Sequence, residues 1–585
     1  MAPALRTCSC CCLVAALLAM ADSAEAGSGF LKHVNRDLVA QQVLTELSAL
    51  LGHGSSHERL AHIEDVMRPM YTSLPKQQDG GIDQGVARYA LNRYFSAHRG
   101  WHITGIAYDG KRWNASSSTA MLKSKMPSFI IELLEEHIAS HRLGLGELAV
   151  LAATVEDLVR REAFEVLTMV YEAYNLSTHE PLENEAQEDL VIKTFTLFYT
   201  MPWTQETRKN SSAVRLHLES AHKYNPAWND TLLWVEDLAG TLKYQNHAGQ
   251  RRFSKGEAYF RSYLAMVHLV EHITDGYGLY QDIQCRELKN MMMGLETQER
   301  NDGRVLLANF YMPYRKGTHD FFVERPEYLQ SLGALDESDP KRPSVIVPNF
   351  LYGRAFCVAT DNAFQSFCCV DQCNVLMETL EQSVAHSVAS PGLIAEVVAG
   401  LPSDTVAAPR NLSGSLRGKL DAIAKQHGGH VPLHGRLFAQ WMHHAFPNEC
   451  PQPREPGVTE APMTHNEWRA RQNTTSYVSK QVIQELLDLA AKTEGPACED
   501  ESCMLWADEE ELITDIDLKA LASPRAEWLH GQQNVVCFLA MCGAVAALIS
   551  ILLESVRSSA SILRPQVSKA ASFGTDGPPS RVHLI

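Results

Sequence analysis

The chain has 585 residues, and 45% of them are hydrophobic, a content that is typical of globular proteins and excludes a wholly disordered chain. Its formal net charge of −17 at pH 7 argues against nucleic acid or anionic lipid as a partner of the soluble part. A chain of this length exceeds what one hydrophobic core supports, so we expect several domains.

The first residues are typical of a secretory signal peptide. Arg6 precedes an apolar run at Leu13–Met20, and Ala24-Glu25-Ala26 has the small-residue pattern of a cleavage site. We therefore expect residues 1–26 to be removed and the mature chain to begin near Gly27 in an exported compartment.

Residues 27–180 are predicted to form an N-terminal helical domain. Apolar residues recur at helical spacing in 31–75, after Pro127 and in 146–174. The segment Trp101–Ile106 interrupts this pattern, and we expect it to be non-helical. Few segments alternate as strands do, so the predicted class is mainly α.

Residues 181–290 are predicted to form a central helical domain. Ser254 and Glu257 have the spacing of a capping box, which predicts the start of a helix, and Gly276 predicts its end. We expect the apolar side of this helix to consist of Phe260, Tyr263, Leu264, Val267 and Val270.

The same helix carries the motif His268-Leu269-Val270-Glu271-His272. It matches H-x-x-E-H, the pattern of inverted zincins, in which two histidines one helical turn apart bind zinc and the glutamate is the general base. Because both histidines lie off the predicted apolar side, we expect an exposed pair. The alternative is a zinc hydrolase with His268 and His272 as metal ligands and Glu271 as catalytic base.

Residues 291–450 are predicted to form a cysteine-containing helical domain. In it, Gly303-x-Val305 and Gly429-x-Val431 resemble the centre of an EF-hand loop, and the second lies between predicted helices at 413–427 and 434–445. With each glycine at loop position 6, the ligand positions 1, 3, 5 and 12 hold Gln298, Arg300, Asp302 and Asn309 in the first loop, and Ala424, Gln426, Gly428 and Gly435 in the second. Only Asp302 is a carboxylate, so we predict degenerate EF-hand-like helix pairs without a calcium site.

Eight cysteines lie between the signal peptide and the apolar segment near the C-terminus, and in an exported protein an even number favours disulfides. They are Cys285, Cys357, Cys368, Cys369, Cys373, Cys450, Cys498 and Cys503. We predict that Cys498 pairs with Cys503, and that Cys357 pairs with Cys368 or Cys369. A zinc site at residues 368–373 is a weaker alternative, because no C-x-x-C spacing is present.

Two further groups of histidines have the residue types of metal ligands. His137 and His141 are four residues apart, and we expect them at the edge of a helix interface. A denser group consists of His427, His430, His434, His443, His444 and Cys450. It favours helix capping and packing, with a transition-metal site as the alternative.

The C-terminal part is predicted to cross a membrane. Residues 451–534 form an acidic stalk with a helix near 477–491, and residues 535–553 contain no charge or proline over a helical length of about 28 Å, close to the thickness of a bilayer core. The tail, residues 554–585, is more basic than the outer flank, which predicts a type I orientation. Small residues four apart in the span, such as Gly543 and Ala547, are compatible with self-association.

Six N-x-S/T sequons lie on the predicted outer side, where glycosylation is possible. Their asparagines are Asn114, Asn175, Asn210, Asn229, Asn411 and Asn473.

Several long motifs also occur together and in this order in one known family. They are residues 101–105, 146–156, 303–311, 331–348, Cys368-Cys369 and 427–451, the last reading HGGHVPLHGRLFAQWMHHAFPNECP. Over about residues 85–453 the chain resembles a large family of exported proteins of dinoflagellate algae. The resemblance implies an ordered, disulfide-linked ectodomain and implies no activity.

The sequence contains no P-loop, no G-x-S-x-G elbow and no dinucleotide fingerprint, so we expect no cofactor. We expect a single-pass glycoprotein of the plasma membrane or an endomembrane, with its N-terminus outside or in the lumen. Its ectodomain is expected to bind a protein or glycan ligand or to build a surface layer. The zinc hydrolase is the alternative.

Overall fold

The computed structural model describes residues 56–77, 80–103, 106, 143–201, 210–225, 227–249, 261–296, 302–317, 322–358, 362, 365–454, 462–492 and 505–513. The predicted signal peptide, the helix expected after Pro127, the predicted span and the tail lie outside these residues. Within them, no helix combines the length and the apolarity needed to cross a bilayer. The described part of the chain is mainly helical, as the sequence predicts.

The N-terminal elements are built around one long helix. They are α3 (Ser56–Ser73), α4 (Gln84–Arg99), β1 (Trp101–Ile103) and α7 (Leu145–Ala173). The side chain of Asp83 accepts the N–H of Val86 and caps α4, and Glu147 accepts the N–H of Gly144 at 2.7 Å and starts α7. The helix predicted at 146–174 and the non-helical segment after Gly100 are thereby confirmed.

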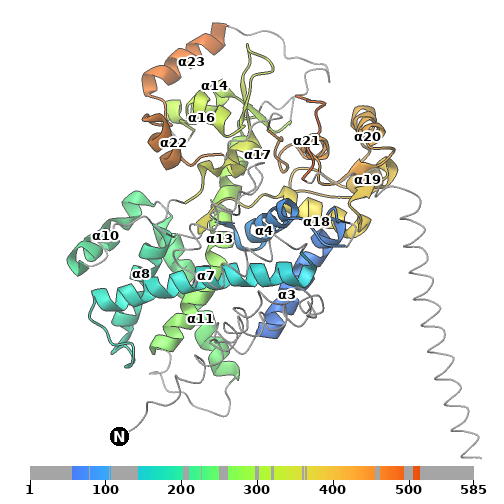
Figure 1. Cartoon of the computed structure of the whole chain (residues 1–585). Helices are drawn as coiled ribbons and strands as arrows, with labels where there is room; N and C mark the ends of the chain where they lie inside the picture. The colour runs from blue at the N-terminus through green and yellow to red at the C-terminus, as the bar shows by residue number, and fades with distance from the viewer. Residues whose placement is uncertain are drawn as a thin grey trace, which may run out of the picture. The chain divides into compact units, whose positions relative to one another are not determined.

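Four helices follow, and the last of them is the longest in the described residues. They are α8 (Glu185–Thr200), α10 (Ser211–Tyr224), α11 (Trp228–Gly249) and α13 (Tyr263–Met293). In Figure 1, α7 is the long cyan helix, with α3 near one end and α8 near the other, and it also packs against α13. These contacts place α3, α4, α8 and α13 around α7.

The prediction that the helix carrying the H-x-x-E-H motif ends at Gly276 is wrong. Helix α13 is capped by Ser262 and continues through Gly276 and Gly278 to Met293. Both glycines lie where another element comes close: a methyl group on Gly276 would lie 3.2 Å from the Trp234 ring, and Gly278 meets the backbone at the end of α4. Tertiary packing therefore overrides the stop signal of glycine. The predicted capping box at Ser254 lies outside the described residues.

The middle of the chain consists of short elements. They are β2 (Arg304–Leu306), α14 (Leu307–Phe310), α15 (Met312–Lys316), α16 (Pro326–Ser331), β3 (Leu335–Asp336), β4 (Ser344–Ile346), α17 (Val347–Phe350), the π-helical turn η3 (Leu351–Ala355) and β5 (Gln365–Phe367). Strand β4 pairs with β2 and β3, both antiparallel, and β5 pairs with β1, also antiparallel.

The remaining elements are mostly helices. They are α18 (Cys373–Val384), β6 (Val388–Ala389), α19 (Pro391–Ala399), α20 (Gly414–Gln426), β7 (Val431–Pro432), α21 (Arg436–Ala445), α22 (His465–Gln472) and α23 (Lys480–Lys492). Strands β6 and β7 pair antiparallel. The helices predicted near 413–427, 434–445 and 477–491 are confirmed as α20, α21 and α23.

Buried apolar side chains form three clusters. The first joins α3, α4, α7, α8, α11 and α13, and the second joins α18 to α21. The third surrounds α14 to α17 and includes Trp468 of α22 and both Ile483 and Leu487 of α23. Part of the segment that the sequence assigns to the stalk therefore packs against this third cluster.

Three pairs of cysteine sulfur atoms lie at disulfide-bond distance. Cys285 of α13 pairs with Cys369, and their Cα atoms are 5.6 Å apart. Cys357 pairs with Cys368, which is one of the two predicted pairings, and Cys373 of α18 pairs with Cys450 after α21. These bonds tie the last turns of α13, the segment before α18 and the end of α21 into one framework.

Candidate functional site

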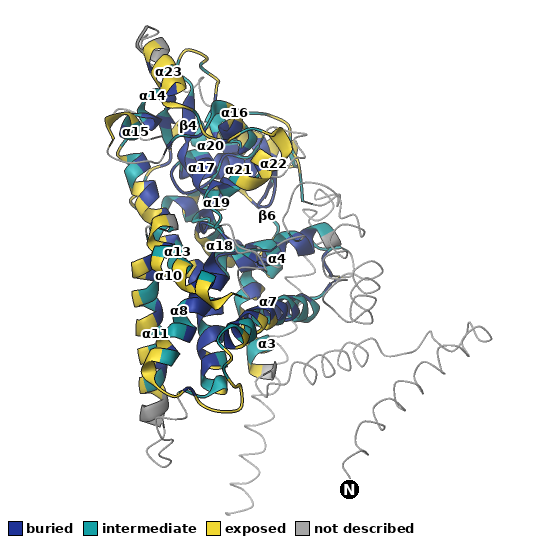
Figure 2. Ribbon diagram, turned by 90° about the vertical axis from the view of Figure 1, so that its left-hand side faces the viewer, coloured by how far each residue is buried: buried dark blue, intermediate teal, exposed yellow. Residues whose placement is uncertain are grey.

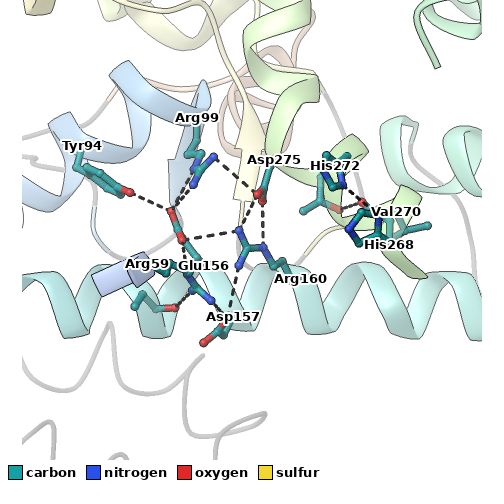
Figure 3. Close-up of polar contacts among 12 residues, drawn as sticks. Arg59, Tyr94, Arg99, Glu156, Asp157, Arg160, His268, Val270, His272 and Asp275 are labelled. Atoms are coloured by element: carbon teal, nitrogen blue, oxygen red, sulfur yellow. Dashed lines mark hydrogen bonds and ion pairs between the residues drawn. The ribbon is translucent and has the colours of Figure 1, made fainter. Parts of the chain in front are cut away.

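The H-x-x-E-H motif lies near the start of α13. His268 is exposed, and Glu271 and His272 are partly exposed. The two imidazole rings are 4.6 Å apart, centroid to centroid, and Figure 3 shows them on α13 beside Asp275. Nδ1–H of His272 donates to the backbone carbonyl of His268 at 2.9 Å. In a neutral ring, this hydrogen bond leaves the lone pair on the opposite nitrogen, Nε2.

The buried side of α13 differs in part from the predicted apolar side. Leu264, which we expected to be buried, is 64% exposed, whereas Met266, Leu269, Val270, Ile273 and Tyr277 are buried. The reason is that α13 packs against α4, α7 and α11, and their positions select the buried side. The two histidines lie outside the buried side in both cases.

The protonation state of His268 suits metal binding at neutral pH. Partial burial lowers its pKa below the ordinary value, neighbouring His272 lowers it further, and Glu271 opposes both effects. A neutral imidazole is the form that binds a transition metal.

The part of the chain that the structure describes places no third ligand beside this pair. Among the described residues, no group of three or more histidine, cysteine, aspartate or glutamate side chains has the geometry to hold a metal ion. A catalytic zinc site uses three protein ligands and one open position. The described residues thus bring together His268 and His272 and supply no complete zincin site around Glu271.

Next to the motif, six side chains form a charge-balanced group that we call the arginine–carboxylate cluster. It consists of Arg59 of α3, Arg99 of α4, Glu156, Asp157 and Arg160 of α7, and Asp275 of α13 (Figure 3). Three positive and three negative side chains balance one another, and they connect four helices.

Glu156 is the centre of the arginine–carboxylate cluster. It is fully buried, and its Oε1 accepts hydrogen bonds from Tyr94 at 3.0 Å and from Arg99 at 2.9 and 3.1 Å. Arg59 donates to Oε2 at 3.2 Å. Arg160 donates two bonds to Asp275, at 2.6 and 3.1 Å. A buried carboxylate with this many charged donors holds its helices in a defined position.

The cluster also shifts the proton affinities of its members. Burial lowers the pKa of Arg160, but the hydrogen bond and charge of Asp275 raise it above its ordinary value. Burial raises the pKa of Asp157, and Arg59 opposes that shift. The sequence reasoning missed this cluster because its partners are far apart in the chain: Arg59 and Glu156 are 97 positions apart, and Arg160 and Asp275 are 115 positions apart. The local signal was on α7, where Glu156 and Asp157 each lie about one turn before Arg160.

The C-terminal histidine group has separate roles rather than one common site. His434 contacts Oε1 of buried Glu381 through Nε2 at 2.8 Å, and Arg93 of α4 binds the same carboxylate. His443 donates from Nδ1 to the carbonyl of Cys450 at 2.7 Å. Cys450 itself is paired with Cys373, so its sulfur is not a free thiolate. This arrangement agrees with the preferred interpretation of helix packing.

His427 has a partner from the acidic segment near the C-terminal end of the described residues. Its Nε2 lies 3.0 Å from Oε2 of Glu510, and Oε1 of Glu510 accepts the N–H of Leu437 at the start of α21, also at 3.0 Å. The same segment forms a bridge between Leu512 and Gly435. A carboxylate from far along the chain therefore covers the start of α21.

The central glycines of the two predicted EF-hand-like loops both have a positive φ angle. Gly303 and Gly429 both have positive φ angles, 72° and 97°, and a short antiparallel strand follows each. Asn309 donates from Nδ2 to the carbonyl of Leu295 at 3.2 Å, so its amide is engaged within the protein. Gln298 and Arg300 lie outside the described residues.

The predicted glycosylation and cysteine residues are placed in part. Five sequon asparagines, Asn175, Asn210, Asn229, Asn411 and Asn473, are exposed. Asn114, the histidine pair His137 and His141, and the cysteines Cys498 and Cys503 lie outside the described residues.

Comparison of the chain with protein-family models, with curated proteins and with solved structures gives no match.

Proposed function

We propose that this chain is a single-pass type I membrane glycoprotein whose helical, disulfide-linked ectodomain is a binding or structural module. The observation that carries the proposal is that all six cysteines in the described part of the chain are paired. Such pairing is expected of an oxidising, exported compartment. The signal-peptide and span patterns of the sequence support the same compartment.

The positions of the sequons support a glycoprotein. A glycan needs an asparagine side chain at the surface, and the five described sequon asparagines are all exposed. They lie in separate regions, at the end of α7, at the starts of α10 and α11, before α20 and at the end of α22. Glycans at these positions leave other surfaces open for contact.

Large apolar side chains at the surface support a role in binding. Six of them lie on the three successive helices α10, α11 and α13, where exposed residues are abundant in Figure 2. They are Leu216, Leu233, Tyr244, Leu264, Leu279 and Ile283, with exposed fractions between 43% and 74%. Helices α10 and α11 are in contact, as are α11 and α13, and exposed apolar surface is typical of interaction sites. We propose a protein or glycan as the ligand class.

We further propose that β2 with β4, and β6 with β7, are the centres of two degenerate EF-hand-like pairs. Supporting this, Val305 pairs with Val345 and Val431 pairs with Ala389, each in a short antiparallel contact. Strands β2 and β4 lead directly into α14 and α17, and β6 and β7 are followed within a few residues by α19 and α21. A calcium loop uses a bidentate glutamate at position 12. Here that position holds Asn309 or Gly435, so the pairs act as packing units.

Calcium titration tests these packing units. We expect the melting temperature of the purified chain to be the same in 1 mM calcium and in chelator, because the loops lack the carboxylates that neutralise the ion. Asp302→Ala is the matched variant, because Asp302 is the one carboxylate at a ligand position. A calcium-dependent rise in melting temperature that Asp302→Ala removes would contradict the proposal.

Peptide mapping tests the exported, glycosylated state. Digestion of the unreduced protein should recover the three cysteine pairs of the structure and a Cys498–Cys503 peptide. Enzymatic glycan release should convert the occupied sequon asparagines to aspartate, a mass change that peptide analysis detects. Free thiols at these cysteines together with unmodified sequons would contradict the proposal.

We also propose that the chain is related to the exported proteins of dinoflagellate algae that it resembles. The resemblance rests on motifs between residues 85 and 453 that occur in the same order in that family. A signal peptide on a chain with these motifs is consistent with an exported family.

A further inference from the structure

His268 and His272 have the geometry of a two-ligand chelate. They are one turn apart on the outer side of α13, and their ring centroids are 4.6 Å apart. Histidines at this spacing direct their ring nitrogens to one point outside a helix. Zinc binds imidazole nitrogen at roughly 2.0–2.1 Å, a distance that small side-chain rotations reach from such a pair.

The hydrogen bond of His272 prepares one of the two ligands. A histidine that binds metal through one nitrogen usually donates its other N–H to a carboxylate or a backbone carbonyl. His272 makes this bond from Nδ1 to the carbonyl of His268, at 2.9 Å, while Nε2 stays available. This hydrogen bond therefore sets the tautomer of the neutral His272 ring without a bound metal ion.

The described residues of one copy supply only half of a closed site. Structural zinc is four-coordinate, and the described residues place no third histidine, cysteine, aspartate or glutamate in a metal-binding group with this pair. Two coordination positions therefore remain open on the solvent side of α13. A second pair of imidazoles would fill both of them.

We propose that His268 and His272 form a zinc half-site that a second copy of this chain completes with the same two histidines. A two-fold axis through the metal relates the copies, so each contributes an identical surface. The ion then has four imidazole ligands and joins the two α13 helices.

The surface around the pair suits a second α13. Leu264, Leu279 and Ile283 are exposed at positions that share one side of the helix with the histidines. These side chains would lose contact with water if another helix packed there. The net charge of −17 disfavours association of two copies, and a bound divalent cation partly offsets that repulsion. Association is therefore expected to depend on the metal.

Light scattering of the purified full-length chain in detergent, with zinc or with chelator, tests the inference. We expect the protein mass in zinc to be twice the mass in chelator, with one zinc bound per two chains by elemental analysis. His268→Gln and His272→Gln should each prevent the doubling and lower zinc affinity at least about tenfold. Their melting temperatures in chelator should equal that of the wild type, because neither imidazole is part of the core.

His179→Gln is the matched control, because His179 is exposed and lies outside α13. It should double in mass with zinc as the wild type does. Doubling that persists in the His268→Gln, His272→Gln double variant would overturn the inference. One zinc per chain without a change in mass would also overturn it, since the half-site would then be completed within one copy. Neither result affects the disulfide and glycan tests of the proposed function.

Discussion

Gly278, in the middle of α13, lies directly against Gly100, which ends α4. A methyl group on Gly100 would lie 2.5 Å from the carbonyl carbon of Gly278, inside any real contact distance. Gly100 also has a φ of 63°, a conformation that favours glycine. Two glycines with different reasons for their presence thus allow α4 and α13 to approach backbone to backbone.

Gly278→Ala should therefore destabilise the protein. The added methyl group overlaps the backbone at Arg99 and Gly100, and relief of the overlap requires α4 and α13 to separate. We expect a loss of about 2–3 kcal/mol in unfolding free energy, measured by denaturant titration of the purified chain.

Gly240→Ala is the control, because Gly240 lies within α11 and a methyl group there has no atom within 4 Å. Alanine favours the helix, so this variant should gain up to about 1 kcal/mol. Equal stability of Gly278→Ala and the wild type would contradict the close approach of the two helices.

Glu156→Gln tests the arginine–carboxylate cluster. The substitution keeps the shape of the side chain and removes the charge, so Arg59 and Arg99 lose their buried partner. Breaking a buried ion pair from one side costs about 3–5 kcal/mol. Glu165→Gln, an exposed change on the same helix, should stay within about 0.5 kcal/mol of the wild type in the same denaturant titration. A similar small effect of Glu156→Gln would show that the cluster does not hold the helices together.

The stability of the protein should depend on pH through Glu324. Burial raises the pKa of this carboxyl from an ordinary 4.5 to about 7, and the N–H groups of residues 323 and 324 oppose the shift. Between these values the folded state keeps a proton that the unfolded state releases, so this group makes the protein less stable as pH rises from 4.5 to 7.

His465 has the opposite effect on stability, and its Nε2 lies 3.9 Å from Oε1 of Glu324. Burial lowers the pKa of His465 from 6.5 to about 4, so the protein loses stability as pH falls through that range.

Glu324→Gln should remove only the contribution of the carboxyl. Relative to the wild type, we expect the variant to be nearly neutral at pH 4 and more stable by about 2–3 kcal/mol at pH 7, since one pKa unit corresponds to about 1.4 kcal/mol. Denaturant titrations at several pH values measure the difference. Glu327→Gln, a change at an exposed neighbour, is the control for the substitution itself. A difference between Glu324→Gln and the wild type that does not change with pH would contradict the raised pKa of Glu324.

Local patterns predicted the long helices well. Periodicity over more than two turns located α7, α20, α21 and α23, because each has a clear apolar side and a start signal, such as Glu147 in α7 or Ser413 before α20. The same reasoning failed for Gly276, because its neighbour Trp234 comes from another helix. Tertiary contacts decide whether a glycine ends a helix or lies within it, and a single sequence does not show these contacts.

Disulfide and ion-pair partners that are far apart in the sequence could not be predicted for a similar reason. The pairing of Cys357 with Cys368 or Cys369 followed from their proximity in sequence, whereas Cys285 and Cys369 are 84 residues apart and Cys373 and Cys450 are 77 apart. In the candidate site, the spacing of His268 and His272 predicted an exposed pair on one helix side. Glu156 and its arginines come together only because α3, α4 and α13 pack around α7.

Topology is the most direct test of the proposed type I glycoprotein. A C-terminal epitope tag is added after Ile585, and protease is applied to intact cells or sealed vesicles with the ectodomain side out. The account predicts loss of the glycosylated ectodomain and survival of a small tagged fragment that contains residues 535–585. Digestion of the tag while the ectodomain remains intact would contradict the account.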